Sequence, residues 1–277
     1  MSGLRSSKPR LREHALVTRQ SGSGTGVQVR MFTIHAMAKV LVVGATSDVA
    51  HALIPRLLHE GHEVIGIGRD TDRLEAFRSE AAFTGVVGDL TVDRLTEAIT
   101  AAGDSGVDAV VHLVGSIALR PPHAMTVEAF EDVLRTNLTS AFLTLSTLGK
   151  AMMRSGGGRM VFVSSVAASL GLANHEAIAA AKGGLAAMVR SAAATYARRG
   201  LRVNAVAPSL TDTRMAAPLL RTDAAREASE QMVPTGRLNT AADVAEAVRW
   251  LLLDAPDGIT GEVMHLDGGL GRLRATG

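Results

Sequence analysis

The chain has 277 residues, of which 47% are hydrophobic and 20% are charged, an ordinary composition for a globular protein that buries a full core. It contains no cysteine, which excludes disulfides, thiolate metal sites and a thiol nucleophile and is compatible with the cytoplasmic location that we expect. No run of 18 apolar residues occurs, so the sequence predicts no membrane span.

The first 36 residues differ from the rest in charge. They carry six basic side chains and one acidic one, whereas the remainder carries 23 basic and 26 acidic side chains. They are rich in Ser, Gly and Arg and show no helical or strand period, so we expect 1–36 to be a disordered basic extension before one domain over 37–273. A transit peptide or an over-long gene start would both explain it. The mildly acidic remainder argues against nucleic-acid binding.

From Lys39 onward, apolar strand-like runs alternate with helical patterns. Strands are predicted over 39–43, 62–68, 84–87, 108–114, 159–164, 201–207 and 262–266, and helices over 48–60, 71–79, 92–102, 127–154, 175–199 and 240–253. This alternation predicts βαβ units with right-handed crossovers. The expected fold class is therefore α/β, a Rossmann-type doubly wound parallel sheet in a single domain.

A turn suited to phosphate follows the first strand, where residues 43–50 read VGATSDVA. A strand, a tight turn and a helix N-terminus together offer backbone N–H groups and a favourable helix dipole to an anion. Gly44 allows the tight turn. The other candidate phosphate contacts follow it directly: Thr46, Ser47, Asp48 and Val49. Asp48 stands where a second glycine is usual; Asp caps helices, but its charge would oppose a pyrophosphate.

The second strand is predicted to end at Gly68, and Arg69 follows it. An NAD site usually places an acidic residue at this strand tip to hold the ribose 2′-hydroxyl, whereas a guanidinium suits the 2′-phosphate of NADP. The sequence therefore favours NADP over NAD, with Arg69 as a contact. The alternative is that Arg69 simply opens a surface helix.

Several ordered motifs between Lys39 and Leu270 resemble those of short-chain dehydrogenases/reductases. The pair Asp89-Leu90 looks like the one beside the adenine, and Gly115 is all that 112–115 retains of an Asn-Asn-Ala-Gly motif. The later matches are Thr136-Asn137-Leu138, Ser164-Ser165, Lys182, Asn204–Pro208, Thr213, Ile259-Thr260-Gly261 and Leu266–Gly269. The resemblance implies hydride transfer between a nicotinamide and a carbonyl or an alcohol.

The resemblance also implies roles for individual residues. Ser165 would polarise the carbonyl, Lys182 would hold the cofactor ribose, and Asn137 would position a water relay. The residues implied to lie beside the cofactor are Asp89, Leu90, Gly115, Lys182, Pro208, Leu210 and Thr213.

The tyrosine that donates the proton in this family has no counterpart, because its position, four residues before Lys182, holds Ile178. An aliphatic side chain neither donates nor accepts a proton. The only tyrosine, Tyr196, lies 18 residues further along the same predicted helix. That separation is about 27 Å at the rise of a helix, so Tyr196 cannot substitute.

His175 is the candidate replacement acid. It precedes Lys182 by seven residues, which places both on one face if the helix has begun there. The spacing is similar to that of enoyl-thioester reductases, whose tyrosine lies seven residues before the lysine, and an imidazole titrates near neutral pH. One alternative is that His175 and Glu176 only form the helix N-terminus. Another is that a water held by Lys182 and Asn137 supplies the proton.

The sequence thus predicts an NADP-dependent oxidoreductase with atypical proton transfer, acting on a small carbonyl, alcohol or conjugated substrate. A catalytically silent NADP-binding sensor or partner subunit is the alternative, and a site that binds no dinucleotide is a third. No metal site is expected, because no two histidines show metal-binding spacing on a helix.

The surroundings of the site are predicted less closely. Loops 116–125 and 209–238 are expected to shape the pocket, with Met215 and Met232 in a mobile flap or an ordinary surface helix. The long Ala-rich helices over 127–154 and 175–199, taken with the resemblance, imply a homodimer or homotetramer.

Overall fold

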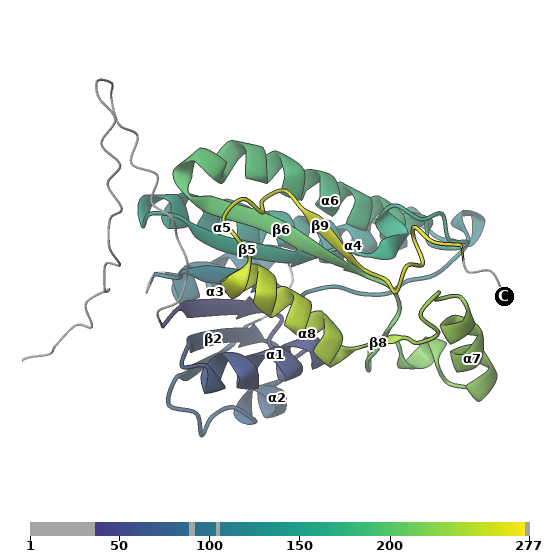
Figure 1. Ribbon diagram of the computed structural model, residues 1–277, viewed down its shortest axis with the longest axis horizontal. Helices are drawn as coiled ribbons and strands as arrows, with labels where there is room; N and C mark the ends of the chain where they lie inside the picture. The colour runs from purple at the N-terminus through teal and green to yellow at the C-terminus, as the bar shows by residue number, and fades with distance from the viewer. Residues whose placement is uncertain (1–36, 89–91, 104–105, 275–277) are drawn as a thin grey trace, which may run out of the picture.

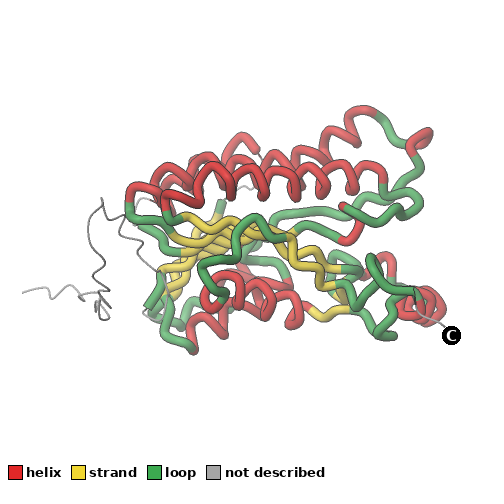
Figure 2. Tube along the Cα trace, turned by 45° about the horizontal axis from the view of Figure 1, so that its top comes forward, coloured by secondary structure: helices red, strands yellow, loops and turns green. Residues whose placement is uncertain are grey.

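The computed structural model describes residues 37–88, 92–103 and 106–274. The expected basic extension, 1–36, and the pair Asp89-Leu90 lie outside these described residues. Within them, a seven-stranded parallel sheet with strand order β3-β2-β1-β4-β5-β6-β9 carries helices on both faces (Figures 1 and 2). The predicted fold class, a single doubly wound α/β domain, is confirmed.

The elements follow the predicted alternation closely. The strands of the sheet are β1 Lys39–Val43, β2 Glu63–Gly68, β3 Phe83–Val87, β4 Ala109–His112, β5 Gly158–Val163, β6 Leu201–Pro208 and β9 Val263–Leu266. The helices are α1 Asp48–His59, α2 Thr71–Glu75, α3 Val92–Gly103, α4 Val127–Leu134, α5 Ser140–Arg154, α6 Glu176–Tyr196, α7 Asp223–Gln231 and α8 Ala241–Arg249.

Both faces of the sheet are covered, which explains why its strands read as continuous apolar runs. Helices α1 and α8 pack on one face, and α3, α5 and α6 pack on the other. In β1, Val40 and Val42 face the first layer, whereas Leu41 and Val43 face the second. Side chains alternate along a strand, so each layer receives every second residue.

The structure corrects the predicted boundaries at several places. Helix α2 ends at Glu75 rather than at residue 79, and the predicted helix 127–154 contains a π-helical turn, Arg135–Thr139, between α4 and α5. The predicted helix 240–253 is α8 followed by a second π-helical turn, Trp250–Asp254. A π turn inserts one residue without interrupting the apolar pattern, so periodicity does not reveal it.

The segment 209–238 is a folded unit with its own helix. It contains β7 (Thr211–Asp212) and α7, and β7 pairs in parallel with β8 (Asn239–Thr240) to form a second, two-stranded sheet. Figure 1 shows α7 beyond the carboxyl edge of the main sheet, away from its helical layers. The surface-helix alternative therefore describes 223–231 correctly.

The connections leave an opening at one edge of the main sheet. From β1 the chain proceeds outward to β2 and β3 and then returns to β4 on the other side of β1. The loops after β1 and β4 consequently diverge at the carboxyl ends of the strands, where open α/β sheets bind their ligands.

Candidate active site

A cavity of about 560 Å³ opens at the carboxyl ends of β1, β4, β5 and β6. Most of the site residues predicted from sequence line it: Ser47, Asp48, Val49, Gly115, Asn137, Ser165, His175, Lys182, Pro208, Leu210 and Thr213. Gly44, Thr46 and Arg69 do not line it. The candidates Asp89 and Leu90 fall outside the described residues.

The turn after β1 depends on Gly44. Its φ is +93°, a conformation that L side chains rarely adopt, and a Cβ there would lie 3.0 Å from the carbonyl carbon of Leu113. The N–H groups of Gly44 and Ala45 both donate to the Ile67 carbonyl, at 2.9 and 2.8 Å, and so fix the turn to the tip of β2. Only glycine fits the conformation and the close approach together.

Ser47, rather than Asp48, caps α1. The Ser47 hydroxyl accepts a hydrogen bond from the Ala50 N–H at 3.1 Å, and Asp48 is the first residue of the helix. The N-terminus of a twelve-residue helix therefore borders the cavity, where its dipole favours an anion.

Asp48 is paired with two arginines. Arg73 Nη2 donates to its Oδ1 at 2.9 Å, while Arg214 donates to Oδ1 from Nε and to Oδ2 from the backbone N–H, both at 2.7 Å. Burial alone would raise the pKa of Asp48, but the hydrogen bonds from Arg214 and the charges of Arg214 and Arg73 hold this pKa below its ordinary value. One carboxylate against two guanidiniums leaves a positive balance around Asp48.

The tip of β2 packs closely against the turn after β1. A Cβ at Gly68 would lie 2.4 Å from Cγ2 of Thr46, so a larger residue at 68 would require the Thr46 side chain to move. The sequence did not reveal this contact, because it joins β2 to the loop of another strand. Arg69, the next residue, is exposed.

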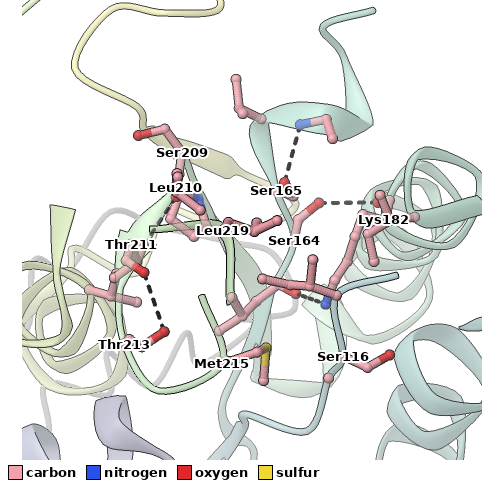
Figure 3. Close-up of a pocket in the computed structure, with 18 of the residues that line it drawn as sticks. Ser116, Ser164, Ser165, Lys182, Ser209, Leu210, Thr211, Thr213, Met215 and Leu219 are labelled. Carbon is pink, nitrogen blue, oxygen red and sulfur yellow. Dashed lines mark hydrogen bonds between the residues drawn. The ribbon is translucent and has the colours of Figure 1, made fainter. Parts of the chain in front are cut away.

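Lys182 lines the cavity across from Thr213 in Figure 3 and is 7% exposed. Its Nζ donates to the Val163 carbonyl at 2.8 Å, and the Ser164 hydroxyl donates to the Lys182 carbonyl at 3.1 Å (Figure 3). Burial lowers the pKa of Lys182 to about 8. A Cβ at Gly115 would lie 3.6 Å from this Nζ, so Gly115 keeps the approach to the ammonium open.

Asn137 is fully buried in the π-helical turn between α4 and α5. Its Oδ1 accepts from the Ser116 N–H at 3.1 Å, and its Nδ2 donates to the Ser116 hydroxyl and to the Val133 carbonyl, both at 3.0 Å. Both amide hydrogens are thus used within the protein. The side chain positions Ser116, a cavity residue that our sequence reasoning missed although it directly follows Gly115.

Ser165 and Ile178 line the same end of the cavity. The Ser165 hydroxyl accepts from the Ala167 N–H at 3.2 Å and keeps its own hydrogen for another acceptor. Ile178 is 6% exposed and packs in an apolar cluster with Val133, Ala167 and Ala181. The cavity surface at Ile178, four residues before Lys182, is therefore aliphatic, and we call it the aliphatic wall.

His175 lines the cavity from the position just before α6. The helix begins at Glu176, so a shared helical face with Lys182 does not place the imidazole. Nδ1 lies 2.7 Å from the Ala173 carbonyl. Because a carbonyl only accepts, Nδ1 carries the hydrogen of this bond, and Nε2 is left as the atom that can face a substrate. Glu176 does not line the cavity.

His112, which replaces the first residue of the altered motif, is a core residue. Its Nδ1 lies 2.9 Å from the Thr144 hydroxyl and its Nε2 3.1 Å from the Ser140 hydroxyl. Burial, with a smaller contribution from the Lys182 charge, lowers the pKa of His112 to about 3, so the ring is neutral. In the part of the chain that the structure describes, no group of three His, Asp or Glu residues is arranged to hold a metal ion.

The remaining wall of the cavity is mainly apolar. In Figure 3, the side chains of Met215 and Leu219 extend from the 209–238 segment into the cavity. They point toward the wall that carries Lys182 and Ser116. Met215 and Met232 are about half exposed. The other apolar contributors include Leu113, Val114, Ile117, Leu119 and Leu172.

Among the described helices, none is long and apolar enough to traverse a bilayer.

Several known proteins are similar to this chain in sequence and in fold. A family model described as Enoyl-(Acyl carrier protein) reductase matches residues 43–271. The 3-oxoacyl-[acyl-carrier-protein] reductase MabA of Mycobacterium tuberculosis (strain CDC 1551 / Oshkosh) is 33% identical over 235 residues, which cover 84% of this chain and 92% of MabA. The corresponding reductase FabG of Escherichia coli (strain K12) is 32% identical over 236 residues, covering 83% and 96%.

Solved structures agree with the fold. An oxidoreductase of the short chain dehydrogenase/reductase family from Burkholderia thailandensis superposes with a TM-score of 0.76 at 32% identity, covering 85% of this chain and 93% of that one. A putative NAD(P)-dependent gluconate 5-dehydrogenase from Beutenbergia cavernae, with bound NADP, superposes with a TM-score of 0.80 at 28% identity, covering 86% and 98%.

Proposed function

The chain belongs to the short-chain dehydrogenase/reductase family of NAD(P)-dependent oxidoreductases, and from this premise we propose that it uses NADP to reduce a carbonyl or conjugated substrate, or to oxidise the corresponding alcohol, with a proton donor other than tyrosine. One observation carries the proposal: a single cavity is lined both by the N-terminus of α1 and by Ser165 and Lys182.

The residues present fit a dinucleotide. Gly44 and the capped N-terminus of α1 form the cradle for a pyrophosphate, and Gly115 leaves space beside Asn137 and Lys182 that a Cβ would reduce. When bound, a nicotinamide dinucleotide would supply or accept a hydride. The absence of an acidic residue at the tip of β2 and the exposed Arg69 that follows it support NADP over NAD, with Arg69 as the proposed 2′-phosphate contact.

Three side chains would act at the reacting end of the cavity, which is the end lined by Ser165 and Lys182. The Ser165 hydroxyl, which keeps a donor hydrogen, would polarise the substrate oxygen. Lys182 would hold the ribose with the N–H groups left after its bond to Val163. Asn137 would act by fixing Ser116 at the cavity wall.

We propose His175 as the proton donor, through Nε2. Its Nδ1–H bond to the Ala173 carbonyl fixes the ring, so Nε2 would donate from the doubly protonated imidazolium, and the neutral ring left after donation would regain a proton from solvent. A positioned general acid contributes roughly 10²- to 10⁴-fold to rate. The lining of Leu113, Ile117 and Met215 further suggests that the unreactive part of the substrate is apolar.

The first test is binding, followed by turnover. We expect NADPH to bind the full-length protein, measured as a change in its fluorescence, and to be consumed with a member of a panel of ketones, aldehydes and enoyl thioesters. The His175→Ala variant should then lose roughly 10²-fold or more in kcat while its NADPH affinity stays the same. Absence of NADPH binding would refute the proposal.

A second candidate function is favoured by the aliphatic wall at Ile178. If this position abolishes proton transfer altogether, the protein is a catalytically silent NADP-binding sensor or partner subunit. In that case NADPH binds with normal affinity, no substrate of the panel is turned over, and His175→Ala changes nothing. An active homologue that co-purifies with the chain would support this candidate.

We also propose that the protein forms a homodimer or homotetramer. Phe142 on α5 and Val127 on α4 are 53% and 68% exposed, respectively, and a second copy would cover such side chains. The mass of the full-length protein measured by light scattering tests this. A cytoplasmic location remains a prediction.

A further inference from the structure

Arg214 links two segments that are remote in sequence. It belongs to the 209–238 segment, yet it contacts the turn after β1, 166 residues earlier. Its backbone N–H and its Nε each donate to a different carboxylate oxygen of Asp48, and its Nη2 donates to the Thr46 carbonyl at 2.9 Å. Three hydrogen bonds thus hold one guanidinium-bearing residue at the N-terminus of α1.

Arg214 therefore lies where the cavity meets the N-terminus of α1, which we call the phosphate end of the cavity. Arg214 lines the cavity together with Ser47, Asp48 and Val49 on the turn and Thr213 on its own segment. The Arg214 side chain is 58% exposed, so its guanidinium is accessible while its orientation is fixed. A planar guanidinium held in this way can present its remaining N–H groups to phosphate oxygens.

The charges around Asp48 also favour an anion. Arg73 contributes a second guanidinium to the same carboxylate, which leaves an excess of one positive charge. The buried Nε of Arg73 has no hydrogen-bond partner among the described residues. Arg73 does not line the cavity, so its part in the cluster is the positive charge that it contributes.

We propose that Arg214 binds the pyrophosphate of the dinucleotide directly and that Asp48 is the residue that positions it. The inference rests on the proposed function, since it names a ligand of the cofactor. It also gives Asp48 a purpose, because the carboxylate that would otherwise repel phosphate serves as the anchor of a cation. The 209–238 segment thereby contributes to cofactor binding as well as to the substrate wall.

The test compares the affinities of two cofactors. NADPH and NADH share the pyrophosphate and differ in the 2′-phosphate, so a pyrophosphate contact affects both alike. We expect Arg214→Gln to weaken both by about tenfold, which is the loss of one partly exposed charge-assisted hydrogen bond. Arg69→Gln should weaken only NADPH. Fluorescence titration at fixed ionic strength measures the dissociation constants of both cofactors for each full-length variant and for the unchanged protein.

Arg221→Gln is the matched control. Arg221 is an exposed arginine of the same segment that does not line the cavity. Its replacement removes the same charge from the segment and should leave both affinities unchanged. The unfolding midpoint of each variant shows whether it folds. If Arg214→Gln does not fold, Arg214→Lys keeps the charge but loses the planar fork, and should weaken both cofactors by a smaller factor.

A double variant separates direct contact from charge neutralisation. Arg214→Gln leaves Asp48 facing the phosphates with only Arg73 beside it. Adding Asp48→Asn removes the opposing carboxylate, so affinity should recover in part but stay below that of the unchanged protein. Full recovery would mean that Arg214 only neutralises Asp48, and would overturn the proposal.

Three other results would also overturn it. Unchanged affinities in Arg214→Gln would exclude a contact. A loss confined to NADPH would assign Arg214 to the 2′-phosphate, and tighter binding of both cofactors would make Arg214 a competitor of the ligand. If instead the unchanged protein binds neither cofactor, it is the proposed function itself that fails.

Discussion

The two ends of the cavity are built in different ways. At the phosphate end, a glycine turn, a capped helix and the pairing of Asp48 with Arg73 and Arg214 join parts of the chain that are far apart in sequence. At the other end, Lys182 makes a single hydrogen bond through its ammonium, Ser165 retains a donor, and the wall at Ile178 is aliphatic.

This contrast separates binding from chemistry. The phosphate end relies on backbone geometry and several charged contacts, so no single side chain decides it. The reacting end depends on individual functional groups, and one residue there can remove proton transfer without disturbing the fold. Substitutions at the two ends should therefore affect different measurements.

The largest expected effect comes from Ile178→Tyr. A phenol four residues before Lys182 would supply a general acid, which contributes roughly 10²- to 10⁴-fold. If the protein is the catalytically silent candidate, reduction of simple ketones should rise by about 10²-fold or more in initial-rate measurements, with NADPH affinity unchanged; if His175 already donates the proton, the rise should be smaller. Ile178→Phe is the matched control, because it adds the same ring without the hydroxyl. Equal rates for the two variants would show that the reacting end lacks more than an acid.

The buried Lys182 should make the stability of the folded protein depend on pH in the alkaline range. Its pKa is lowered to about 8 by burial, so between pH 8 and the unfolded value near 10.4 the unfolded chain holds more protons. Stability therefore rises with pH across this window, by about 3 kcal/mol, and the cost of the buried charge is fully present below pH 8. Lys182→Met should abolish this rise in urea unfolding measured from pH 7 to 10.5. Lys150→Met, at an exposed site, should preserve it.

The phosphate end is tested by two alanine substitutions at glycines of similar conformation. Gly44 and Gly61 have φ of +93° and +86°, but a Cβ would meet backbone atoms only at Gly44 and nothing within 4 Å at Gly61. Gly61→Ala should lose about 1–2 kcal/mol of stability through the strained conformation, and Gly44→Ala should lose more, because its Cβ also meets backbone atoms. Only Gly44→Ala should also lose NADPH affinity, because its Cβ displaces the turn. A similar loss of affinity in Gly61→Ala would contradict this.

The smallest effect is expected from Asp48→Asn at acidic pH. Because the pKa of Asp48 is held below its ordinary value, its contribution to stability is present above the unfolded pKa near 3.9 and is lost as the pH falls through the lower folded value. The variant should therefore lose less stability than the unchanged protein between pH 5 and about 2.5. Parallel acid unfolding curves for the two proteins would argue against the arginine pairing.

The sequence predicted the elements better than the contacts between them. Alternating apolar runs located β1 at 39–43 and α1 from Asp48, because both faces of the sheet are buried and the helices are amphipathic. The resemblance to short-chain dehydrogenases/reductases grouped Ser165 with Lys182, and both line the cavity. The π-helical turn around Asn137 was not visible, because it adds a residue without breaking the pattern.

Contacts over long sequence separations could not be predicted. Nothing in the local sequence of Asp48 indicates that Arg214 will neutralise it, and the composition of 209–238 does not show which arginine reaches the turn. The orientation of His175 was also inaccessible, because it depends on a hydrogen bond made before the helix begins. Side-chain contacts that depend on tertiary structure produce no periodic pattern in the amino-acid sequence.

The close approach of Thr46 to Gly68 limits how cofactor preference could change. An acidic residue introduced at 68 would require the Thr46 side chain to move, so this substitution alone should reduce stability. Thr46→Ser removes the nearest methyl group while keeping the hydroxyl. The two substitutions are therefore expected to be coupled, with a smaller loss of stability from the change at 68 when residue 46 is already serine.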